Sequence, residues 1–582
     1  MWRLPYDFKN KITKRLTFLY GEEKLHRLLE RIGLFIARYY YLREKQPDTT
    51  LWDEKSNILI TYPDMIKLPG EKPLTTLNRF LVDYLSTSIE SVHILPFFPY
   101  TSDEGFSIID YKQVSPHCGE WEDIEELSRN FRLMFDLVLN HVSRCSNWFQ
   151  DYLSGIAPAL NYFIEVDPNT DLSMVIRPRT SPLLTKVKTV FGERYVWTTF
   201  SPDQIDLNYQ CYDLLMEILE VLLFYITKGA KIIRLDAIAY LWKKIGTTCL
   251  NLPETHEVVK LFRDIVDHLA PGTIILTETN LPHDENISYF GNGDEAHMVY
   301  QFALPPLLLY TLHKGNASTL SNWAKTVSQC PPQCTFLNFT ASHDGIGVRP
   351  LESLISEEEI NELVHIVHQL GGLVSYRQTP QGAKPYELNI TYFDALKDLH
   401  KPENLDWQIK RFFCSQIIML GLKGIPGIYF HNLIGSSNYY EGVQKTGQNR
   451  AINRQRLDDR DLREQLNNPD SKQSKIFNTY QKLLQIRKKH SAFHPDAAQE
   501  VLDLGEAIFA FKRKNPESQE TIYCIHNITD KTQKCQLPKD FCFAKDLLAN
   551  IYNPKTTCQN NQLTLEPYQC CWLINGRQRN EK

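Results

Sequence analysis

The feature of this chain that most restricts its fold is an alternation of short apolar runs with longer stretches of helical periodicity. Residues 213–229 and 255–270 are two such helical stretches, and apolar runs flank them. Repeated strand–helix alternation predicts an α/β fold in which parallel strands are covered by helices. The eight runs predicted as strands are residues 57–62, 92–98, 133–141, 231–237, 273–279, 297–306, 335–344 and 424–431. Eight such units favour a closed (β/α)8 barrel of the TIM-barrel type.

Two connections and the two ends of the chain depart from this alternation. Residues 142–205, after the third strand, and 345–408, after the seventh, are too long for plain loops, so we expect an inserted subdomain at each place. From about residue 495 short alternating runs predict a C-terminal antiparallel β-domain. The expected division is N-terminal helices (1–50), three barrel segments (51–141, 206–344 and 409–494), the two insertions (142–205 and 345–408) and the β-domain (495–582).

Charge and composition argue against several classes of function. The net charge of −5 gives no sign of binding to nucleic acid or to an anionic membrane. No uncharged apolar run reaches 18 residues, and no apolar segment follows the basic residues near the N-terminus, so neither a spanning helix nor a signal peptide is predicted. The 13 cysteines are scattered and are expected to be reduced thiols rather than zinc ligands. We therefore expect a cytoplasmic protein without a bound metal, either a monomer or a homodimer.

Polar residues stand where several of the predicted strands end. They are Asp136, Asn140 and His141 in the third strand, Asp236 in the fourth, Glu278 in the fifth and Asp344 in the seventh. In a (β/α)8 barrel these strand ends converge on the rim that carries catalytic groups. Arg234 precedes Asp236 by two residues, so it shares one face of the strand and can hold that carboxylate ionised. A single strand-end Asp could be a helix N-cap or a salt-bridge partner, but carboxylates on three strands favour a site.

Carboxylates in this arrangement fit two kinds of chemistry. Retaining glycoside cleavage needs one carboxylate as nucleophile and a second as acid and then base, and a less solvated site raises the pKa of the acid. A third carboxylate can stabilise an oxocarbenium-like transition state. A cluster that binds a divalent cation would use the same residue types, so the strand ends alone leave both alternatives open.

Longer segments around these residues resemble a known family. The stretches LMFDLVLNHVS, IIRLDAIAY, ILTETN and FLNFTASHDGIG are similar to the four signature segments of the α-amylase superfamily, glycoside hydrolase family 13, in the same order. The chain most resembles its sucrose phosphorylase branch, through DEGFSIIDY, RPRTSPLLT, WTTFSPDQIDLN, QFALPPLLL, HDGIGV and AINR. Within that branch the glucosylglycerate phosphorylases are most similar, through LDAIAYLWKKIGTTC and NYYEGVQKTGQNRAINR among other segments. The resemblance runs from about residue 55 to the end of the chain.

The resemblance implies roles at matching positions. Asp236 would be the nucleophile, Glu278 the general acid/base and Asp344 the group that stabilises the transition state. The residues expected to bind the glucosyl unit are Asp103, Phe106, His141, Arg234, His343 and Arg454. Asp206, in QIDLN, is expected to form a turn.

At the acceptor side the resemblance implies a phosphate site and a substrate-binding loop. Arg179, in RPRT, matches an arginine implicated in phosphate binding, and a guanidinium suits a phosphate oxyanion, although taken alone Arg179 could be a surface salt-bridge residue. Tyr386 matches the loop on the acceptor side, in the second insertion. Glu387 is expected to bind substrate there, and it replaces the Gln of sucrose phosphorylases, which argues against sucrose as the donor. A glycerate carboxylate would need a cation nearby, for which the candidates are Lys384, Arg377 and Arg450.

The expected activity is a reversible phosphorolysis of 2-O-α-D-glucosylglycerate to α-D-glucose 1-phosphate and D-glycerate. Phosphate would be a substrate, and no cofactor is expected. Sucrose, sucrose 6′-phosphate and glucosylglycerol remain alternative donors. An α-glucan hydrolase or transglucosidase and a non-catalytic amylase-like protein are further alternatives, the last disfavoured because the chain keeps all three carboxylates.

Overall fold

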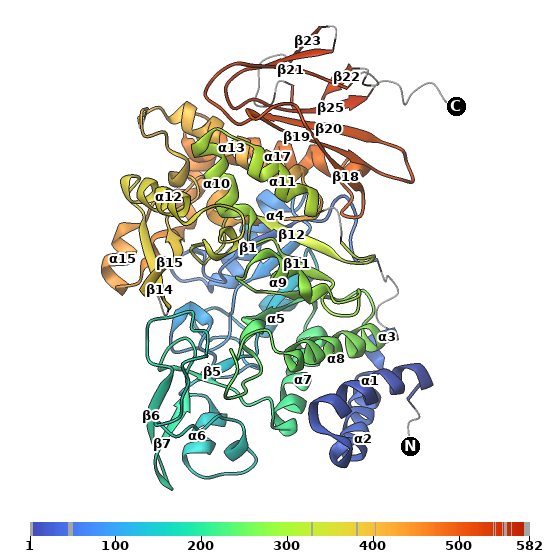
Figure 1. Cartoon of the computed structure of the whole chain (residues 1–582), viewed down its shortest axis with the longest axis vertical. Coiled ribbons are helices and arrows are strands. Elements are labelled where there is room, and N and C mark those ends of the chain that lie inside the picture. The colour runs from blue at the N-terminus through green and yellow to red at the C-terminus, as the bar shows by residue number, and fades with distance from the viewer. Residues whose placement is uncertain are drawn as a thin grey trace.

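The centre of the molecule is a closed barrel of parallel strands, which confirms the predicted (β/α)8 fold (Figure 1). The computed structural model describes residues 4–44, 50–327, 330–379, 382–401, 403–538, 541, 543–549, 551, 556–559 and 561–575. In order around the barrel the strands are β1 (Ile58–Thr61), β16 (Ile425–Tyr429), β12 (Thr335–Phe339), β11 (Met298–Tyr300), β10 (Ile274–Thr277), β9 (Ala230–Asp236), β4 (Arg132–Val138) and β3 (Ser91–Ile94).

Helices follow the strands and cover the outside of the barrel (Figure 1). The main ones are α4 (Pro73–Leu85), α5 (Trp121–Ser128), α7 (Tyr212–Thr227), α8 (Pro253–Leu269), α10 (Leu304–Lys314), α11 (Ser318–Thr326), α13 (Leu405–Gly421), α16 (Asp459–Asn467) and α17 (Lys472–Arg487). A proline begins α4 and α8, where its missing N–H would have had no partner within the helix. Several predicted strands were too long at their C-terminal ends. Residues 304–306, for example, begin α10, and residues 430–431 begin the short α14 (Phe430–Leu433).

Strand alternation decides which side chains point into the barrel. In β9, Ile232 belongs to the apolar cluster that fills the barrel, whereas Ile233 and Leu235 belong to the core beneath the helices. Successive side chains of a strand point to opposite faces, so Arg234 and Asp236 share the inner face with Ile232. The charged pair therefore lies nearer the carboxyl ends of the strands than this apolar filling.

The two insertions stand on the same side of the barrel (Figure 1). The first contains β5 (His141–Ser143), α6 (Asn147–Leu153), β6 (Leu184–Thr189), β7 (Gly192–Trp197) and β8 (Gln204–Asp206). The second contains β13 (Ile346–Gly347), α12 (Glu357–Gln369), β14 (Leu373–Thr379) and β15 (Gly382–Asn389). The expected limits of these insertions cut through elements, because β5 pairs with β8 at the two ends of the first insertion and residue 408 lies inside α13.

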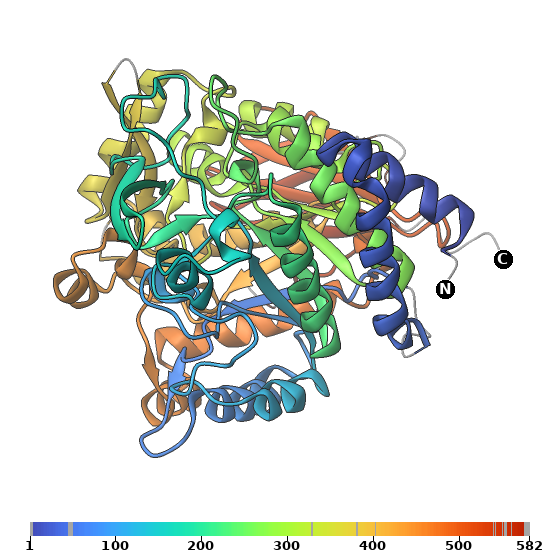
Figure 2. The ribbon, with the colours of Figure 1, turned by 90° about the horizontal axis from the view of Figure 1, so that it is seen from below.

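Both ends of the chain add to the barrel. The N-terminal helices α1 (Tyr6–Tyr20) and α3 (Tyr41–Glu44) lie beside α8, and α2 (Glu22–Tyr39) contacts α7 through the ion pair of Arg38 with Glu220 (Figures 1 and 2). Arg15 of α1 makes ion pairs of 3.4 Å with Asp264 and 3.2 Å with Glu257, both on α8, which fix this arrangement.

The C-terminal strands form antiparallel sheets at the opposite end of the molecule from the first insertion, as the alternating pattern predicts (Figure 1). One sheet has the order β18 (Ala498–Leu502), β19 (Ile508–Lys514), β20 (Thr521–Asn527), β25 (Cys570–Asn575) and β22 (Phe543–Asp546). The other has the order β21 (Gln533–Gln536), β24 (Gln562–Leu565) and β23 (Thr557–Gln559). Residues 576–582 of the expected β-domain lie outside the described residues.

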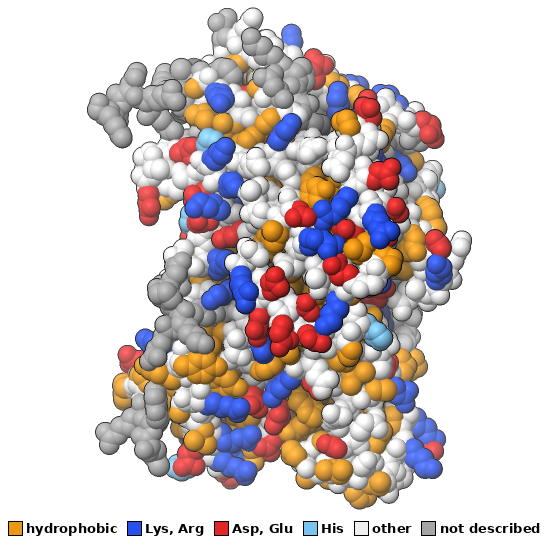
Figure 3. All heavy atoms as spheres, turned by 180° about the vertical axis from the view of Figure 1, so that it is seen from behind, with side chains coloured by type: hydrophobic (Ala, Val, Ile, Leu, Met, Phe, Trp, Pro, Cys, Tyr) orange, Lys and Arg blue, Asp and Glu red, His pale blue; other side chains and the backbone are white. Residues whose placement is uncertain are grey.

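The surface carries both signs of charge. Acidic and basic side chains lie interspersed on the face drawn in Figure 3. Within the described parts of the chain, no helix has the length and apolar character needed to cross a membrane.

Candidate active site

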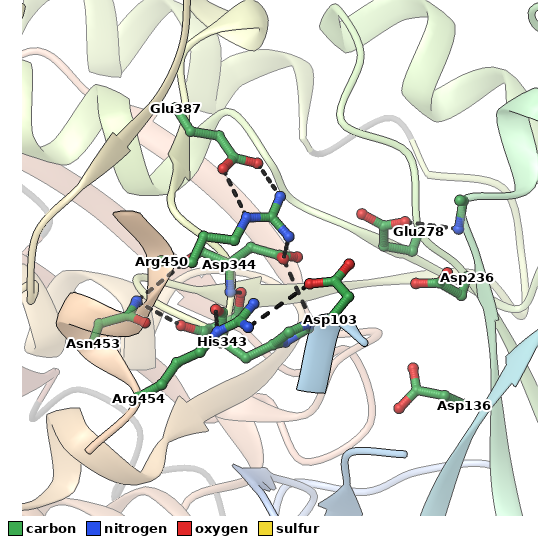
Figure 4. A network of polar contacts seen from close by, with 12 residues as sticks. Asp103, Asp136, Asp236, Glu278, His343, Asp344, Glu387, Arg450, Asn453 and Arg454 are labelled. Atoms are coloured by element: carbon green, nitrogen blue, oxygen red, sulfur yellow. Dashed lines mark hydrogen bonds and ion pairs between the residues drawn. The ribbon is translucent and has the colours of Figure 1, made fainter. Parts of the chain in front are cut away.

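Three carboxylates predicted from the strand ends lie in one pocket. Asp236 is the last residue of β9, Glu278 directly follows β10, and Asp344 lies in the loop between β12 and β13. All three line the pocket at the carboxyl ends of the barrel strands, and Figure 4 shows them around a common space. The sequence prediction that these residues converge is consistent with this arrangement.

Arg234 links the inner carboxylates. Its Nη1 donates to Asp136 Oδ1 at 2.5 Å and to Asp236 Oδ1 at 2.7 Å, while its Nη2 lies 3.8 Å from Glu278 Oε1. Strands β4 and β9 place Asp136 directly beside Arg234 in register, and His93 Nε2 lies 2.7 Å from the other oxygen of Asp136. Asp136 is fully buried and lies within β4, so its placement at a strand end was wrong, and it serves as a counter-charge behind the pocket.

The environment makes both Asp236 and Glu278 harder to ionise. Burial raises the pKa of both carboxyl groups, and the Arg234 guanidinium opposes the rise at each. Two interacting carboxyls titrate as a pair, so they lose their protons in separate steps. The contact of Arg234 with Asp236 is shorter than its contact with Glu278, which favours the negative charge on Asp236.

The backbone between them is held in a strained turn. Ala237 adopts a left-handed conformation with φ +49° and donates its N–H to Glu278 Oε2 at 2.9 Å. A non-glycine residue occupies this region only when its surroundings enforce it. The turn after β9 thus helps to fix the orientation of the Glu278 carboxyl relative to Asp236.

Asp344 has a different environment. Arg450 Nη1 lies 2.6 Å from Asp344 Oδ1, and His343 Nε2 lies 3.5 Å from the same oxygen. Burial would raise the pKa of Asp344, but Arg450 and the other neighbouring cations hold it well below its ordinary value. Asp344 therefore stays ionised throughout the neutral range.

The residues predicted to bind the glucosyl unit lie around these carboxylates. They come from the barrel strands and from the loops that follow them, and we call this part of the pocket the barrel side. The ring of Phe106 stacks on His343 at 4.7 Å, and His141 Nε2 lies 2.9 Å from the Phe106 carbonyl oxygen. Asp103 lies 3.8 Å from Arg454 Nη1, and neither Nη atom of the buried Arg454 makes a hydrogen bond. The structure thus brings the predicted residues together and leaves polar groups near the pocket without protein partners.

A tight turn shapes this side. Asp103 has φ +52°, and Gly105 has φ +115° with so little space that a Cβ there would lie 2.7 Å from the Pro96 carbonyl oxygen. Only glycine fits this position without movement of the backbone. The turn carries both Asp103 and Phe106 into the pocket.

Residues from both insertions form the opposite, insertion side of the pocket. The Arg179 guanidinium lies 5.5 Å from the centre of the Tyr386 ring and 6.0 Å from that of Phe200. No carboxylate in the described chain makes an ion pair with Arg179, and the residue is half-buried. Arg179 and Tyr386 come from segments far apart in the sequence, and the fold places them on one wall, as the resemblance implied.

Glu387 forms an ion pair with Arg450 rather than standing free in the pocket (Figure 4). Its Oε2 accepts from Arg450 Nε at 3.0 Å, and its Oε1 accepts from Nη2. Glu387 is 2 % exposed, so its carboxylate is committed to Arg450, although the side chain still borders the pocket. The expected direct binding of substrate by Glu387 is therefore not supported by the geometry, because both oxygens already face a guanidinium.

The three residues predicted as possible cations for an acceptor carboxylate differ in their position, but each is already in an ion pair. Lys384 pairs with Glu357 at 3.0 Å and Arg377 pairs with Glu352 at 2.7 Å, and neither borders the pocket. Arg450 does border it, but its donors face Glu387 and Asp344. None of these candidates offers a free guanidinium or ammonium group.

Sequence reasoning missed a buried polar link between the first insertion and the barrel. Lys243 Nζ lies 2.7 Å from Asp206 Oδ2 and 2.6 Å from Asn140 Oδ1. Asp206 also accepts from the N–H and the hydroxyl of Thr199, at 2.7 and 2.6 Å. The turn expected at Asp206 was wrong, because the residue is fully buried in β8 and joins three segments. No local pattern identifies Lys243 as its partner.

Further residues that border the pocket carried no signal of their own in the sequence. They are Phe200, Gln204, Tyr240, Thr279, Asn280, Leu281 and Phe302. All but Leu281 lie in segments that resemble the family, so those segments and the barrel topology were the available signals, although no role was predicted for the individual residues.

Comparison with known proteins agrees with this architecture. Residues 81–360 match the family profile described as the catalytic domain of α-amylase, and residues 508–571 match the C-terminal domain of the α-amylase SusG. A glucosylglycerate phosphorylase of Spirochaeta thermophila is 45% identical over 96% of this chain and 95% of its own length. A protein of the same name from Escherichia coli is 40% identical over 97% of this chain and 100% of its own.

A solved structure of similar shape is that of sucrose 6F-phosphate phosphorylase from Thermoanaerobacter thermosaccharolyticum. It superposes with a TM-score of 0.71 at 28% sequence identity and covers 83% of this chain and 95% of its own. The likeness therefore extends over most of this chain.

Proposed function

The chain belongs to the α-amylase family, and from this premise we propose that it is a retaining glycoside phosphorylase that acts on 2-O-α-D-glucosylglycerate. It is a glycosyltransferase in the chemical sense, because it transfers a glucosyl group to phosphate and, in reverse, to D-glycerate. Near-full-length identity of 40–45% to glucosylglycerate phosphorylases supports this donor over those of the sister enzymes.

In the first step the Asp236 carboxylate attacks the anomeric carbon while Glu278 gives its proton to the departing glycerate oxygen. The Arg234 contact favours the ionised form of Asp236, and burial keeps the Glu278 proton at higher pH than an exposed Glu would. Asp344, held ionised by Arg450, stabilises the positive charge that develops on the sugar. The product is a covalent β-glucosyl ester of Asp236, with D-glycerate released.

In the second step phosphate attacks the same carbon from the side that glycerate left, and the ester bond to Asp236 breaks. Two inversions at one carbon give net retention, so the product is α-D-glucose 1-phosphate. Arg179 binds the phosphate, and Glu278, now deprotonated, accepts a proton from it. Phosphate must compete with water here, which requires a cationic acceptor site.

The observation that carries this proposal is the half-buried Arg179 guanidinium over Tyr386, without a carboxylate partner in the described chain, at the edge of a pocket with three carboxylates. A hydrolase that only admits water has no need of a cation at this position. The same position suits phosphate in one direction and an anionic acceptor in the other.

The test is the reverse reaction. The protein is supplied with α-D-glucose 1-phosphate and, in separate reactions, D-glycerate, glycerol, fructose or fructose 6-phosphate, and the release of phosphate is followed. Release that depends strongly on D-glycerate is the expected result. Preference for another acceptor would contradict the donor assignment, and equal release in all reactions and in buffer alone would contradict phosphorolysis.

A further inference from the structure

One buried arginine lies next to the insertion side of the pocket, behind the residues that border it, and has no counter-charge among the described residues. Arg349 opens the turn after β13 and is 6% exposed. Its Nε is shielded from solvent and makes no hydrogen bond. Among the described residues no carboxylate lies within ion-pair distance of its guanidinium, and no contact of its side chain with a backbone carbonyl is seen either.

Three other buried arginines of this protein are neutralised or saturated, whereas Arg454 also has two Nη atoms without hydrogen bonds but lies 3.8 Å from the carboxylate of Asp103. Arg234 and Arg450 each contact two carboxylates at hydrogen-bond distance. Arg487 donates to five backbone carbonyls, those of Leu420, Glu54, Ser56, Gly424 and Phe493. A buried charge without a partner is strongly unfavourable, so Arg349 differs from these in a way that calls for a ligand.

The fold places Arg349 beside the insertion side of the pocket. Strand β13 pairs with β15 so that Gly347 lies opposite Glu387, and the next residue, Val348, donates its N–H to the Tyr386 carbonyl oxygen at 3.1 Å. Arg349 therefore follows directly on the segment that is hydrogen-bonded to Tyr386. Gly347 also packs against Asn280, another residue that borders the pocket, since a Cβ at Gly347 would lie 2.5 Å from its side-chain amide.

The positive charge of Arg349 acts on a residue that borders the pocket. Burial raises the pKa of Tyr240, and the guanidinium groups of Arg349, Arg179 and Arg377 oppose that rise. Tyr240 borders the pocket, with its ring 5.4 Å from that of Phe200, over which Arg179 lies. Three guanidinium groups thus influence one wall, and of these Arg377 is already paired with Glu352.

We propose that Arg349 binds the carboxylate of the acceptor and is the residue that selects D-glycerate over neutral acceptors. This inference rests on the proposed function, because it concerns the same pocket and the acceptor named there. The planar guanidinium can hold a carboxylate through two parallel hydrogen bonds. A hydroxyl group of a neutral acceptor cannot accept both of them.

The remaining cations fit this role less well. Arg450 is held by Glu387 and Asp344, and loss of either contact would release an uncompensated carboxylate. Arg179 is half-buried and lies over the rings of Tyr386 and Phe200, and the proposed function already assigns it to phosphate. Arg349 is more deeply buried and has no competing partner in the described chain. A bound carboxylate would therefore stabilise the Arg349 guanidinium more than it would stabilise the other cations.

The test compares Arg349→Gln and Arg349→Lys with the unchanged protein in three reactions. Glucosyl transfer from α-D-glucose 1-phosphate is measured with D-glycerate and with glycerol, and phosphorolysis is measured with α-D-glucosyl fluoride as donor. For Arg349→Gln we expect kcat/KM with D-glycerate to fall about 30-fold or more, mainly through KM, because two charge-assisted hydrogen bonds are lost. We expect kcat/KM with glycerol and with phosphate to change less than about threefold. Arg349→Lys keeps the positive charge but not the two parallel N–H donors, so its kcat/KM with D-glycerate should lie between those of Arg349→Gln and the unchanged protein.

Lys384→Gln is the matched control, because it removes a positive charge from β15, three residues before Glu387, outside the pocket. It should leave all three reactions unchanged. Equal loss with D-glycerate and phosphate in Arg349→Gln would overturn the proposal by making Arg349 a general anion site. Loss in all three reactions, in Arg349→Lys as well, would show a structural role and overturn it too. If the unchanged protein showed no preference for D-glycerate, the proposed function itself would be wrong. If the unchanged protein prefers D-glycerate and Arg349→Gln keeps that preference, only the role of Arg349 is wrong.

Discussion

The two sides of the pocket differ in how their charges are balanced. On the barrel side Arg234 joins Asp136 to Asp236, and Arg450 joins Asp344 to Glu387 of the second insertion. Figure 4 shows the contacts of Arg450. On the insertion side Arg179 and Arg349 have no carboxylate partner in the part of the chain that the structure describes. Both sides are built around arginines, so residue type does not explain the contrast.

The difference follows from the task of each side. The barrel side must hold fixed protonation states for one invariant sugar, and paired charges in a buried setting fix ionisation and geometry together. The insertion side must accept two different anions in turn, phosphate and glycerate, and release each of them. A guanidinium with a permanent protein partner would first have to break that pair, which weakens ligand binding. Unpaired arginines near the acceptor are thus consistent with reversible phosphorolysis.

The largest expected effect is on the barrel side. Asp236→Ala should lower phosphorolysis of glucosylglycerate by at least about 10⁴-fold, because no other group can form the glucosyl ester. Initial rates of α-D-glucose 1-phosphate formation measure the loss, and a thermal melt checks that the fold remains. Substantial remaining turnover would show that Asp236 is not the nucleophile and that the paired network serves stability alone.

The next effect separates proton transfer from binding. Glu278→Gln should reduce phosphorolysis of glucosylglycerate about 10²- to 10⁴-fold, since the glycerate oxygen needs a proton to leave. With α-D-glucosyl fluoride, whose leaving group needs little protonation, the loss should be much smaller. Equal losses with both donors would contradict the acid role.

A smaller effect tests whether the pairing of Arg450 matters for activity. Glu387→Gln keeps the shape of the side chain but removes the charge that holds Arg450, so Arg450 can shift away from Asp344. We expect a fall of about tenfold in kcat/KM for glucosylglycerate, from the weakening of one buried charge pair. Glu352→Gln, which removes the partner of Arg377 outside the pocket, is the matched control and should leave kcat/KM unchanged. A Glu387→Gln protein as active as the unchanged one would mean that Arg450 needs no such support.

The smallest expected effect is a displacement of the pH profile. Glu278 must be protonated for the first step, and its pKa is raised by burial, so activity should persist above the pH at which an exposed Glu loses its proton and fall as pH rises through the raised value. On the acidic side activity should fall as Asp236 gains a proton. The profile of kcat/KM with glucosylglycerate measures both limbs, and Glu278→Gln should lack the alkaline one. An alkaline limb that survives in Glu278→Gln would assign it to another group.

Sequence reasoning was most successful where function depends on local order along the chain. The alternation of apolar runs predicted the barrel, and the strand-end positions of Asp236, Glu278 and Asp344 predicted that they would meet. It was least successful for pairs made across the fold. Glu387 and Arg450 are 63 positions apart, and Lys243 and Asn140 are 103 apart, so nothing near either residue in the sequence indicates its partner.

What the sequence determined by itself is therefore the framework: the barrel, its carboxylates at the strand ends and the family to which they belong. Those properties follow from periodicity and from short segments, both of which act between residues close in the chain. The folded structure alone shows which charges are neutralised, that Asp136 is a buried counter-charge, that Glu387 holds Arg450 and that Arg349 has no carboxylate partner among the described residues. The physical reason is that electrostatic pairing depends on distance in space and on burial, and both are set by which distant segments the fold brings together.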